Sequence, residues 1–595
     1  MDSASENNPL LEQQPPVPTP VPEAPPQPPK PHHAGQSGIS QVRDTLETVL
    51  LALILAFSFR TFCVEAFVIP TGSMAPTLDG AHFRVIDPKS GYQFDIDANV
   101  NFQWIPGEQF VVLKDGELND PYAIASPDYI ICPNDFYPIP AGQLPDPVVS
   151  RTYYPQDGSS QECYFPYAYN GDRVLVLKYL YWLNPPQRWD VVVFREPMMG
   201  QINFIKRLVG LPGETLEIVG GNVFINGKIA RKPVDVEMAT LQNVYNNDFY
   251  PTDAGQVRAD GSVWNSPWTG VDDASFSGHW STDSSTIRYN TTIGPEKGRL
   301  SFTNTDYLHN DTAYNQEPNP APFIVTSLGR QNPYDREFVG DLCLHTVVNL
   351  LGQRNFAMNT SSLSSQVVAI TLGQAANCFQ VRLNGNGTVS LYRLNTDTQA
   401  FEPVPQKVIL LDKTVQPLNL TQPIGITMSN IDREVRFWVN NDLVLDYQMP
   451  WTVDDAKAYV QNLQGNPDSQ VPLIYLDVSD DCTLQHLMLF RDIYYTQTNI
   501  VGSSQPGTGT SNNPIILGPG QYFMLGDNTN LSDDSRAWNQ VEPVLQSDLN
   551  LPMGVVPQRY VIGRAFMVYW PAGFRPAPGV NWPIVPDVGR MRLIR

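Results

Sequence analysis

The pattern of apolar and polar positions contains a single long apolar stretch, DTLETVLLALILAFSFRTFCVEAFVIP, which begins at Asp44. The nineteen residues from Leu46 to Val64 could just cross a bilayer core of about 30 Å at about 1.5 Å per helical residue. The pattern therefore predicts a transmembrane helix over residues 41–65. A cleaved export signal is the alternative, but such a signal starts close to the N-terminus.

The segment before this stretch, residues 1–40, is dominated by proline, as in PPVPTPVPEAPPQPPKPHH. Such a composition cannot form a packed core and predicts a disordered, partly polyproline-like tail. Lys30 and Arg43 precede the apolar stretch and Arg60 lies at its far end. From this weak charge bias we expect the tail inside the cell and the bulk of the chain outside.

After the apolar stretch, short runs of alternating apolar and polar residues predict β-strands. The clearest runs are DRVLVLKYL, DVVVFRE, NFIKRLVG, TLEIVGGNVFING and YVIGRAFMVYW. In the fourth run, Gly220–Gly221–Asn222 has the composition of a hairpin turn. The chain is therefore expected to be mainly β.

A region of different character, residues 229–515, interrupts these strands. It is rich in Asn, Asp, Thr and Ser, and its strand pairs FQVRLNGNGTVSLYR and DREVRFWVNNDLVLDYQ carry turn residues at their centres. This pattern predicts an inserted β-sandwich domain. A mostly irregular insertion is the alternative.

Charge and cysteine content narrow the functional classes. The net charge of the 595 residues is −22 without a basic stripe, so nucleic acid is excluded as an expected partner. None of the six cysteines forms a C-x-x-C pair, and Cys63 lies in the apolar stretch. No disulfide framework is evident.

Ser73, in AFVIPTGSMAPTLDG, follows the apolar stretch directly. A serine nucleophile needs a base, yet the chain has no G-x-S-x-G or H-E-x-x-H motif. A buried, neutral lysine could serve, and Lys206 in INFIKRLVGLPGE has apolar neighbours. In a strand Lys206 and Arg207 point to opposite faces, so one could be buried and the other solvated. A solvent-facing Lys206 on an edge strand is the alternative.

Four stretches, FVIPTGSMAPTL, RWDVVVFREP, FIKRLVGLPGE and GDNTNLSDDSR with the following VIGRAF, resemble in this order the motifs of type I signal peptidases. The resemblance covers less than a third of the chain. It implies an antiparallel β catalytic core in two parts, 66–228 and 516–595, that works with a Ser/Lys dyad. It implies no cofactor.

The resemblance also implies roles for individual residues. Ser73 is the implied nucleophile, Lys206 the general base and Thr71 the oxyanion donor, while Ser532, Asp534 and Arg536 support the site. Six residues correspond to the lining of small substrate pockets: Phe67, Ile69, Met74, Val193, Phe204 and Ile205.

The chain departs from the family pattern at three places. Trp189 stands where glycine is usual, and we expect it on a surface turn. The insert at 229–515 resembles concanavalin-like or laminin-G-like sandwiches, and it could bind carbohydrate or act as a spacer. A further insertion, about 89–170, contributes to a ribbon-like repeat, VIDPKSGYQF and IICPNDFYPI. Its four ligand positions, Asp87, Ser90, Cys132 and Asp135, make a poor zinc site, so we expect no metal.

The leading hypothesis is a single-pass serine endopeptidase of the inner (cytoplasmic) membrane, with its catalytic domain on the outer face. Its partners would be signal peptides of exported preproteins, the lipid bilayer and, through the insert, cell-surface carbohydrate. The alternative is a membrane-tethered carbohydrate-binding protein with a vestigial protease core. A self-cleaving Ser/Lys protease of the SOS repressor type is disfavoured by the apolar stretch and by the lack of a recognisable DNA-binding module.

Overall fold

The computed structural model describes residues 38–595 apart from several stretches. These are 98–100, 104–110, 114–128, 141–148, 154–160, 166–168, 201, 259–260, 274, 277–278, 291–296, 311–336, 352–365, 405–421, 467–468, 498–506, 531 and 572–585. The chain divides into two units, Met1–Thr61 and Phe62–Arg595. Of the predicted proline-rich tail, 1–40, residues 1–37 lie outside the described residues.

The first unit contains nearly all of the predicted apolar helix, α1 (Gly38–Phe62). Residues Val42–Phe62 have a mean hydropathy of 1.6, which is sufficient in length and composition to cross a bilayer. The helix ends earlier than the predicted segment 41–65, because Val64 already begins the first strand, β1 (Val64–Val68).

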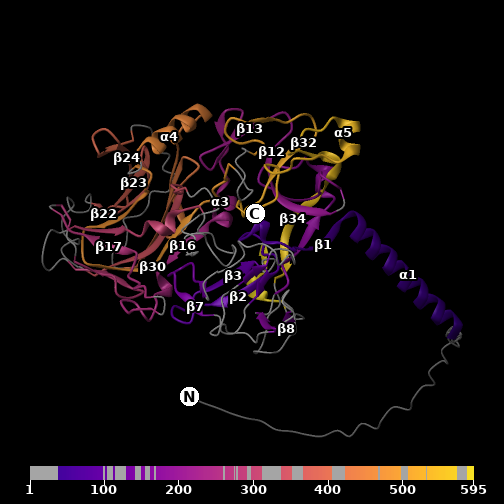
Figure 1. Ribbon diagram of the computed structural model, residues 1–595, viewed down its shortest axis with the longest axis horizontal. Helices are drawn as coiled ribbons and strands as arrows, with labels where there is room; N and C mark the ends of the chain where they lie inside the picture. Colours follow the sequence, from indigo (N-terminus) through magenta and orange to yellow (C-terminus); the bar gives the residue numbers. More distant parts are fainter. Residues whose placement is uncertain are drawn as a thin grey trace, which may run out of the picture. The chain divides into compact units, whose positions relative to one another are not determined.

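The second unit is mainly β, as the alternating runs predicted (Figure 1). One antiparallel sheet is built from both ends of the chain. In spatial order its strands are β1, β10 (Arg173–Leu177), β34 (Val561–Trp570), β11 (Val191–Arg195), β12 (Asn203–Gly210), β32 (Gln521–Leu525) and β33 (Val556–Pro557), and β35 (Arg592–Leu593) pairs with β34. Strands far apart in sequence therefore become neighbours, which brings residues near 73, 206 and 530 together.

A smaller antiparallel sheet contains the predicted glycine hairpin. Its strands are β15 (Lys228–Ile229), β14 (Asn222–Ile225), β13 (Thr215–Val219) and β31 (Ile515–Ile516). Gly220 and Gly221, with φ of 54° and 79°, form the turn between β13 and β14. Both values lie in the left-handed region that a two-residue hairpin turn requires and that glycine adopts without strain.

Two larger sheets form a β-sandwich between residues 242 and 491. The first sheet contains β18 (Trp280–Ser281), β19 (Ile287–Tyr289), β30 (Cys482–Arg491), β21 (Leu342–Leu350), β26 (Ile424–Ile431), β27 (Glu434–Val439) and β28 (Asp442–Gln448), with β16 (Gln242–Asn246) paired to β30. The second contains β17 (Trp268–Val271), β20 (Gly298–Phe302), β29 (Leu473–Val478), β22 (Gln366–Gln374), β23 (Asn377–Asn384), β24 (Val389–Asn395) and β25 (Ala400–Pro403).

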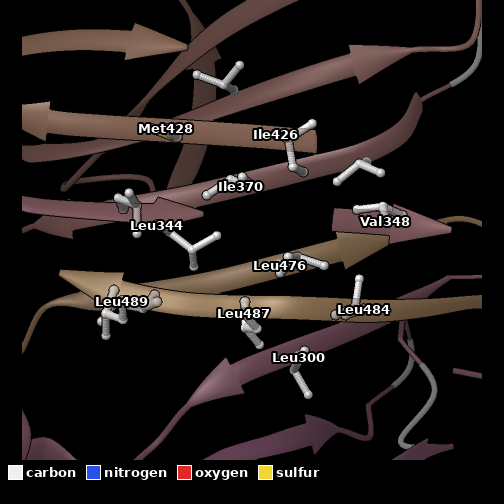
Figure 2. Packing of buried hydrophobic residues seen from close by; sticks show 14 of the residues in the cluster. Leu300, Leu344, Val348, Ile370, Ile426, Met428, Leu476, Leu484, Leu487 and Leu489 are labelled. Atoms are coloured by element: carbon white, nitrogen blue, oxygen red, sulfur yellow. The ribbon is translucent and has the colours of Figure 1, made fainter. Parts of the chain in front are cut away.

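The core of the sandwich is one continuous apolar cluster, to which strands of both sheets contribute side chains. Figure 2 shows Leu476 and Ile370 from the second sheet among Leu344, Leu487 and Leu489 from the first. All five are fully buried. Along β27, for example, Val435, Phe437 and Val439 alternate into this core, as the sequence pattern predicts.

The helices of the second unit are short. They are α2 (Leu180–Leu183), α3 (Val234–Thr240), α4 (Val453–Gly465) and α5 (Pro543–Leu549), and the 3₁₀ turns are η1 (Gly72–Met74), η3 (Asn247–Phe249), η4 (Thr305–Leu308), η7 (Gln558–Tyr560) and η8 (Val588–Arg590). Thr452 and Asp455 form a capping box at the start of α4.

The ribbon-like repeat appears as two similar hairpins, β2 (His82–Ile86) with β3 (Gln93–Asp97) and β6 (Tyr129–Ile131) with β7 (Pro138–Pro140). Each turn closes with the same two backbone hydrogen bonds. In the first, the donor–acceptor pairs are Asp87–Tyr92 and Gly91–Asp87, and in the second they are Cys132–Tyr137 and Phe136–Cys132. Two further hairpins, β4 (Asn101–Gln103) with β5 (Val111–Leu113) and β8 (Val149–Tyr153) with β9 (Gln161–Phe165), lie in the same region.

Candidate active site

Ser73 lies on the 3₁₀ turn η1, a few residues after β1. Its two neighbours, Gly72 and Met74, are buried, whereas Ser73 itself is half-buried. The turn is fixed from the other end of the chain: Asn528 donates its backbone N–H to the Ser73 carbonyl at 3.2 Å and its side-chain amide to the Gly72 carbonyl at 3.1 Å. The hydroxyl is therefore held on a rigid turn with one side accessible.

Lys206 lies in β12 and reaches this turn. Its Nζ is 2.5 Å from Ser73 Oγ, which is within hydrogen-bond distance. The two residues are separated by 133 positions in the sequence, and the sheet brings them together. A nucleophile and a base at this distance form the minimal arrangement for nucleophilic catalysis.

Burial changes the acid–base behaviour of Lys206. Only 4% of the residue is exposed, and its Nζ lies 5.5 Å from the centre of the Phe204 ring. Desolvation lowers the pKa of Lys206 to about 8, although Asp534 and Asp533 oppose this effect. A substantial fraction of this lysine is therefore neutral slightly above neutral pH. Lys206 is thus not the exposed edge-strand lysine that the sequence left open.

The loop after β32 surrounds this pair. Gly526, at its start, donates its N–H to Asp534 Oδ2 at 3.0 Å. Ser532 is buried against Gly526 so closely that a Cβ on the glycine would lie 2.1 Å from Ser532 Oγ and 2.5 Å from the Ser73 carbonyl oxygen. Glycine at 526 thus allows Ser532 and the Ser73 turn to meet.

Asp534 and Arg536 form a buried two-pronged ion pair, with N–O distances of 2.9 and 2.8 Å. Arg536 also donates to the Thr496 carbonyl and hydroxyl, both at 3.0 Å. The Arg536 guanidinium and several hydrogen bonds to Asp534 lower the pKa of this carboxyl despite its burial. Thr496 lies five residues after the end of β30 at Arg491, so the segment that leaves the sandwich supports the ion pair.

Thr71 occupies the position before η1, and its side chain does not cap that turn. The residue is exposed next to the Ser73 turn. The structure thus places Thr71 on the exposed side of the chain, two residues before Ser73.

Five of the six predicted pocket residues contribute to one apolar cluster beside Ser73. Ile69, Met74 and Val193 are buried in it, and Phe67 and Ile205 pack against it. Phe204 instead packs in a separate cluster with Phe194 and Trp538. Since residues 204 and 205 alternate along β12, the two clusters lie on opposite faces of the strand.

The expectation that one member of the Lys206–Arg207 pair is solvated is wrong. Arg207 is completely buried, and its guanidinium bonds both oxygens of Asp527 at 2.8 and 2.6 Å. Thr77 also donates to Asp527, at 2.5 Å. The opposite face of the strand can bury a cation because Asp527 neutralises it. Sequence reasoning missed Asp527 and Thr77, since neither forms a local motif with Arg207.

The expectation that Trp189 lies on a surface turn is also wrong. Only 4% of Trp189 is exposed, and its indole N–H donates to the Arg231 carbonyl at 3.1 Å. Its φ of 75° lies in the left-handed region, which explains why glycine would suit this position. Burial of a large aromatic surface offsets the backbone strain.

The ribbon-like hairpins bring three of the four predicted ligand positions together. The side chains of Asp87, Cys132 and Asp135 lie within 4.8 Å of one another, and Ser90 donates to Asp87 at 2.5 Å. Arg258 donates to Asp135 Oδ2 at 3.0 Å, which supplies the positive charge that the carboxylates need. Burial raises the pKa of Asp135 to about 7 and also raises the pKa of the Cys132 thiol. This donor set fits zinc poorly.

The family described as Signal peptidase, peptidase S26, matches residues 153–265 and 471–570. The matched residues include Lys206 and the loop from Gly526 to Arg536, whereas Ser73 precedes them. The two matched stretches, which the sheet brings to one site, are therefore similar to the signal peptidase family, and each overlaps one end of the β-sandwich between residues 242 and 491.

The relatives that the chain resembles are type I signal peptidases. A "Signal peptidase I" of Leptolyngbya laminosa is 45% identical over 65 residues, which are 10% of this chain and 32% of that protein. A "Probable signal peptidase I-1" of Synechocystis is 32% identical over 117 residues, which are 18% of this chain and 55% of that protein. The chain therefore spans about half or less of these curated relatives.

The solved structure of the carbohydrate-binding module CBM66 from Bacillus subtilis is similar to part of this chain. The match covers 38% of this chain and 95% of that module. The identity is 8% and the TM-score is 0.20. This likeness carries no functional argument.

Proposed function

We propose that this chain is a membrane-anchored serine endopeptidase that removes signal peptides from exported preproteins with a Ser/Lys dyad. The observation that carries the proposal is the 2.5 Å distance between Ser73 Oγ and the buried Nζ of Lys206. The family match supports the same activity, with Lys206 inside the matched residues.

In the proposed mechanism, neutral Lys206 accepts the Ser73 proton while Oγ attacks the scissile carbonyl carbon. The Thr71 hydroxyl and the Ser73 N–H stabilise the resulting oxyanion. The Lys206 ammonium then protonates the leaving amine, which leaves an acyl-enzyme on Ser73. Lys206 next accepts a proton from water as the water oxygen attacks the acyl carbon. The bond between that carbon and Ser73 Oγ then breaks, the Lys206 ammonium returns the proton to Oγ, and the signal peptide leaves.

The remaining predicted residues have supporting roles in this proposal. Ser532 orients the lysine, and the Asp534–Arg536 ion pair fixes the loop that carries it. The apolar cluster with Ile69, Met74 and Val193 forms shallow pockets for small side chains before the cleavage point. A larger side chain would clash there, which gives selectivity by size.

Helix α1 is proposed to anchor the protein in the inner membrane, with the second unit on the outer face. The substrate's cleavage site follows its own apolar segment, so a nucleophile close to an anchor meets it at the bilayer surface. We also propose that the sandwich binds carbohydrate. The alternative of a vestigial protease core is not favoured, because Ser73 and Lys206 lie at reactive distance.

The deciding experiment is cleavage of a preprotein by the detergent-solubilised full chain, with wild type beside Ser73→Ala. We expect one cut, at the signal-peptide junction, with wild type and none with the variant. Equal cleavage by both proteins would refute the proposal.

A further inference from the structure

A second pocket lies where the sandwich meets the smaller sheet of the peptidase part. Its cavity measures about 150 Å³. One wall is the β13–β14 turn, Gly220–Gly221–Asn222, and another is helix α4. The rest of its lining comes from the sandwich and from Ile493 and Tyr494, which follow it. Among the described residues that line this pocket, none belongs to the proposed catalytic site.

Several contacts hold the walls of this pocket in place. Lys457 on α4 forms an ion pair of 2.7 Å with Glu217 on β13, and Tyr459 donates to the Gln374 carbonyl at 2.8 Å. Gly221 lets the Tyr494 ring approach, since a Cβ there would lie 2.3 Å from a ring carbon. The pocket is therefore largely pre-formed, which lowers the cost of binding a ligand.

Five neutral amides line the pocket, namely Asn222, Gln374, Asn377, Gln464 and Gln470. Three of them already donate to backbone carbonyls, Asn222 to Gly220, Gln374 to Gln470 and Gln470 to Leu463. An amide both donates and accepts hydrogen bonds, as a hydroxyl does. Asn377 is 1% exposed, and its Oδ1 has no hydrogen-bond partner among the described residues. Because such buried acceptors are rare, a ligand or water that donates to this atom is expected.

The charged lining does not favour an anionic ligand. The guanidinium of Arg433 lies 4.4 Å from the ring centres of both Trp451 and Tyr459, so it is fixed between aromatic faces. Glu337 and Asp341 line the same pocket and outnumber this cation. Arg433 has a φ of 58°, a left-handed conformation that is strained for arginine. Asp432 and Arg433, both with positive φ, form the two-residue turn between β26 and β27, so this conformation belongs to the hairpin.

We infer that this pocket binds one uncharged sugar unit. The amide atoms that remain, including Asn377 Oδ1 and the exposed Gln464 amide, match sugar hydroxyl groups, and a cavity of this size holds one six-membered ring. The inference deepens the proposal that the sandwich binds carbohydrate, and it does not depend on the Ser/Lys chemistry.

The test uses the detergent-solubilised full chain carrying Ser73→Ala, so that proteolysis plays no part. The probes are glucose, mannose, galactose, fructose and N-acetylglucosamine at millimolar concentrations, followed by saturation-transfer NMR. Benzoate and cyclohexylammonium serve as anionic and cationic probes of similar size. We expect saturation of at least one sugar and of neither charged probe.

Gln464→Trp, at an exposed position that lines the pocket, should fill it and weaken sugar binding by about tenfold or more. Asn462→Trp is the matched control, because Asn462 is exposed on the same helix outside the pocket, and it should bind like the parent. Absence of sugar saturation, a preference for a charged probe, or binding unchanged by Gln464→Trp would each overturn the inference. If the chain binds a sugar but wild type does not cleave a preprotein, the proposed peptidase activity is refuted and the sugar-binding inference stands.

Discussion

The sheet that carries Lys206 and the inserted β-sandwich differ in what fills their centres. Around Ser73, the peptidase part buries charged groups, including Lys206, Arg207, Asp527 and the Asp534–Arg536 pair. The sandwich also buries charged residues, such as Glu434 and Arg436, but the space between its two sheets is filled by one continuous apolar cluster. Buried charges require specific partners and fix geometry, whereas apolar packing mainly provides stability. Substitutions in the two regions should therefore separate rate from stability.

The largest expected effect is on the dyad. Ser73→Ala and Lys206→Arg should each lower the cleavage rate by about 10⁴-fold or more, with little change in melting temperature. Arginine remains charged and cannot accept the Ser73 proton. Ser547→Ala, at an exposed position outside the site, is the control. Preprotein cleavage by Lys206→Arg above a few per cent of wild type would exclude lysine as the base.

The second expected effect concerns the oxyanion. Thr71→Ala should lower kcat by about 10²–10³-fold with little change in KM, because one oxyanion donor contributes only in the transition state. Thr71→Ser retains a hydroxyl and should be mild. Steady-state kinetics on a peptide substrate separates the two parameters. A loss confined to KM would place Thr71 in substrate binding instead.

The sequence predicts those site residues that lie in short motifs, and it does not predict contacts between residues that are far apart in the chain. Ser73 and Lys206 carry motifs within about a dozen residues, so resemblance was sufficient to propose them. Arg207 and Asp527 are 320 positions apart, and no local pattern indicates that they pair. Trp189 was placed wrongly, because neither its burial nor its left-handed backbone is visible in its neighbours.

The same argument applies to the fold. Alternation predicted the strands, and Gly220–Gly221 predicted a turn with positive φ, which the structure confirms. The support of Arg536 by Thr496 was not predictable, since it depends on where the chain leaves the sandwich. Local patterns thus predict elements, whereas contacts between distant elements appear only in the structure.

The third expected effect is a pH dependence of the rate. Burial lowers the pKa of Lys206 to about 8, so the neutral base should decline about tenfold per pH unit below that value. The cleavage rate should rise towards pH 8 and level off above it. Stability should also rise between about pH 8 and the ordinary lysine pKa of 10.5, since the unfolded chain binds more protons there. A rate that is flat from pH 9 to pH 5 contradicts the dyad.

A fourth effect should appear in stability alone. Leu476→Ala removes a fully buried side chain from the sandwich core and should lower the free energy of unfolding by about 2–5 kcal/mol. Leu476→Met, which conserves volume, should cost less than about 1.5 kcal/mol. Denaturant unfolding measures both values. The cleavage rate per folded molecule should not change at low temperature, and a large loss of rate would show that the two regions are coupled.

The last prediction is that removing metal has no effect. It concerns the ribbon-like hairpins, which contact the insert through Asp135 and Arg258. Asp135 lies in the ribbon-like hairpins and Arg258 in the insert, and their ion pair of 3.0 Å engages one of the four positions at which a ribbon would hold a metal ion. One thiol with two carboxylates, one of them already paired with a guanidinium, offers zinc few free ligands. A chelator should therefore leave the melting temperature and the cleavage rate unchanged, and metal analysis should find less than one zinc per chain. One zinc per chain that disappears in Cys132→Ser would show instead that a metal, rather than Arg258, neutralises this cluster.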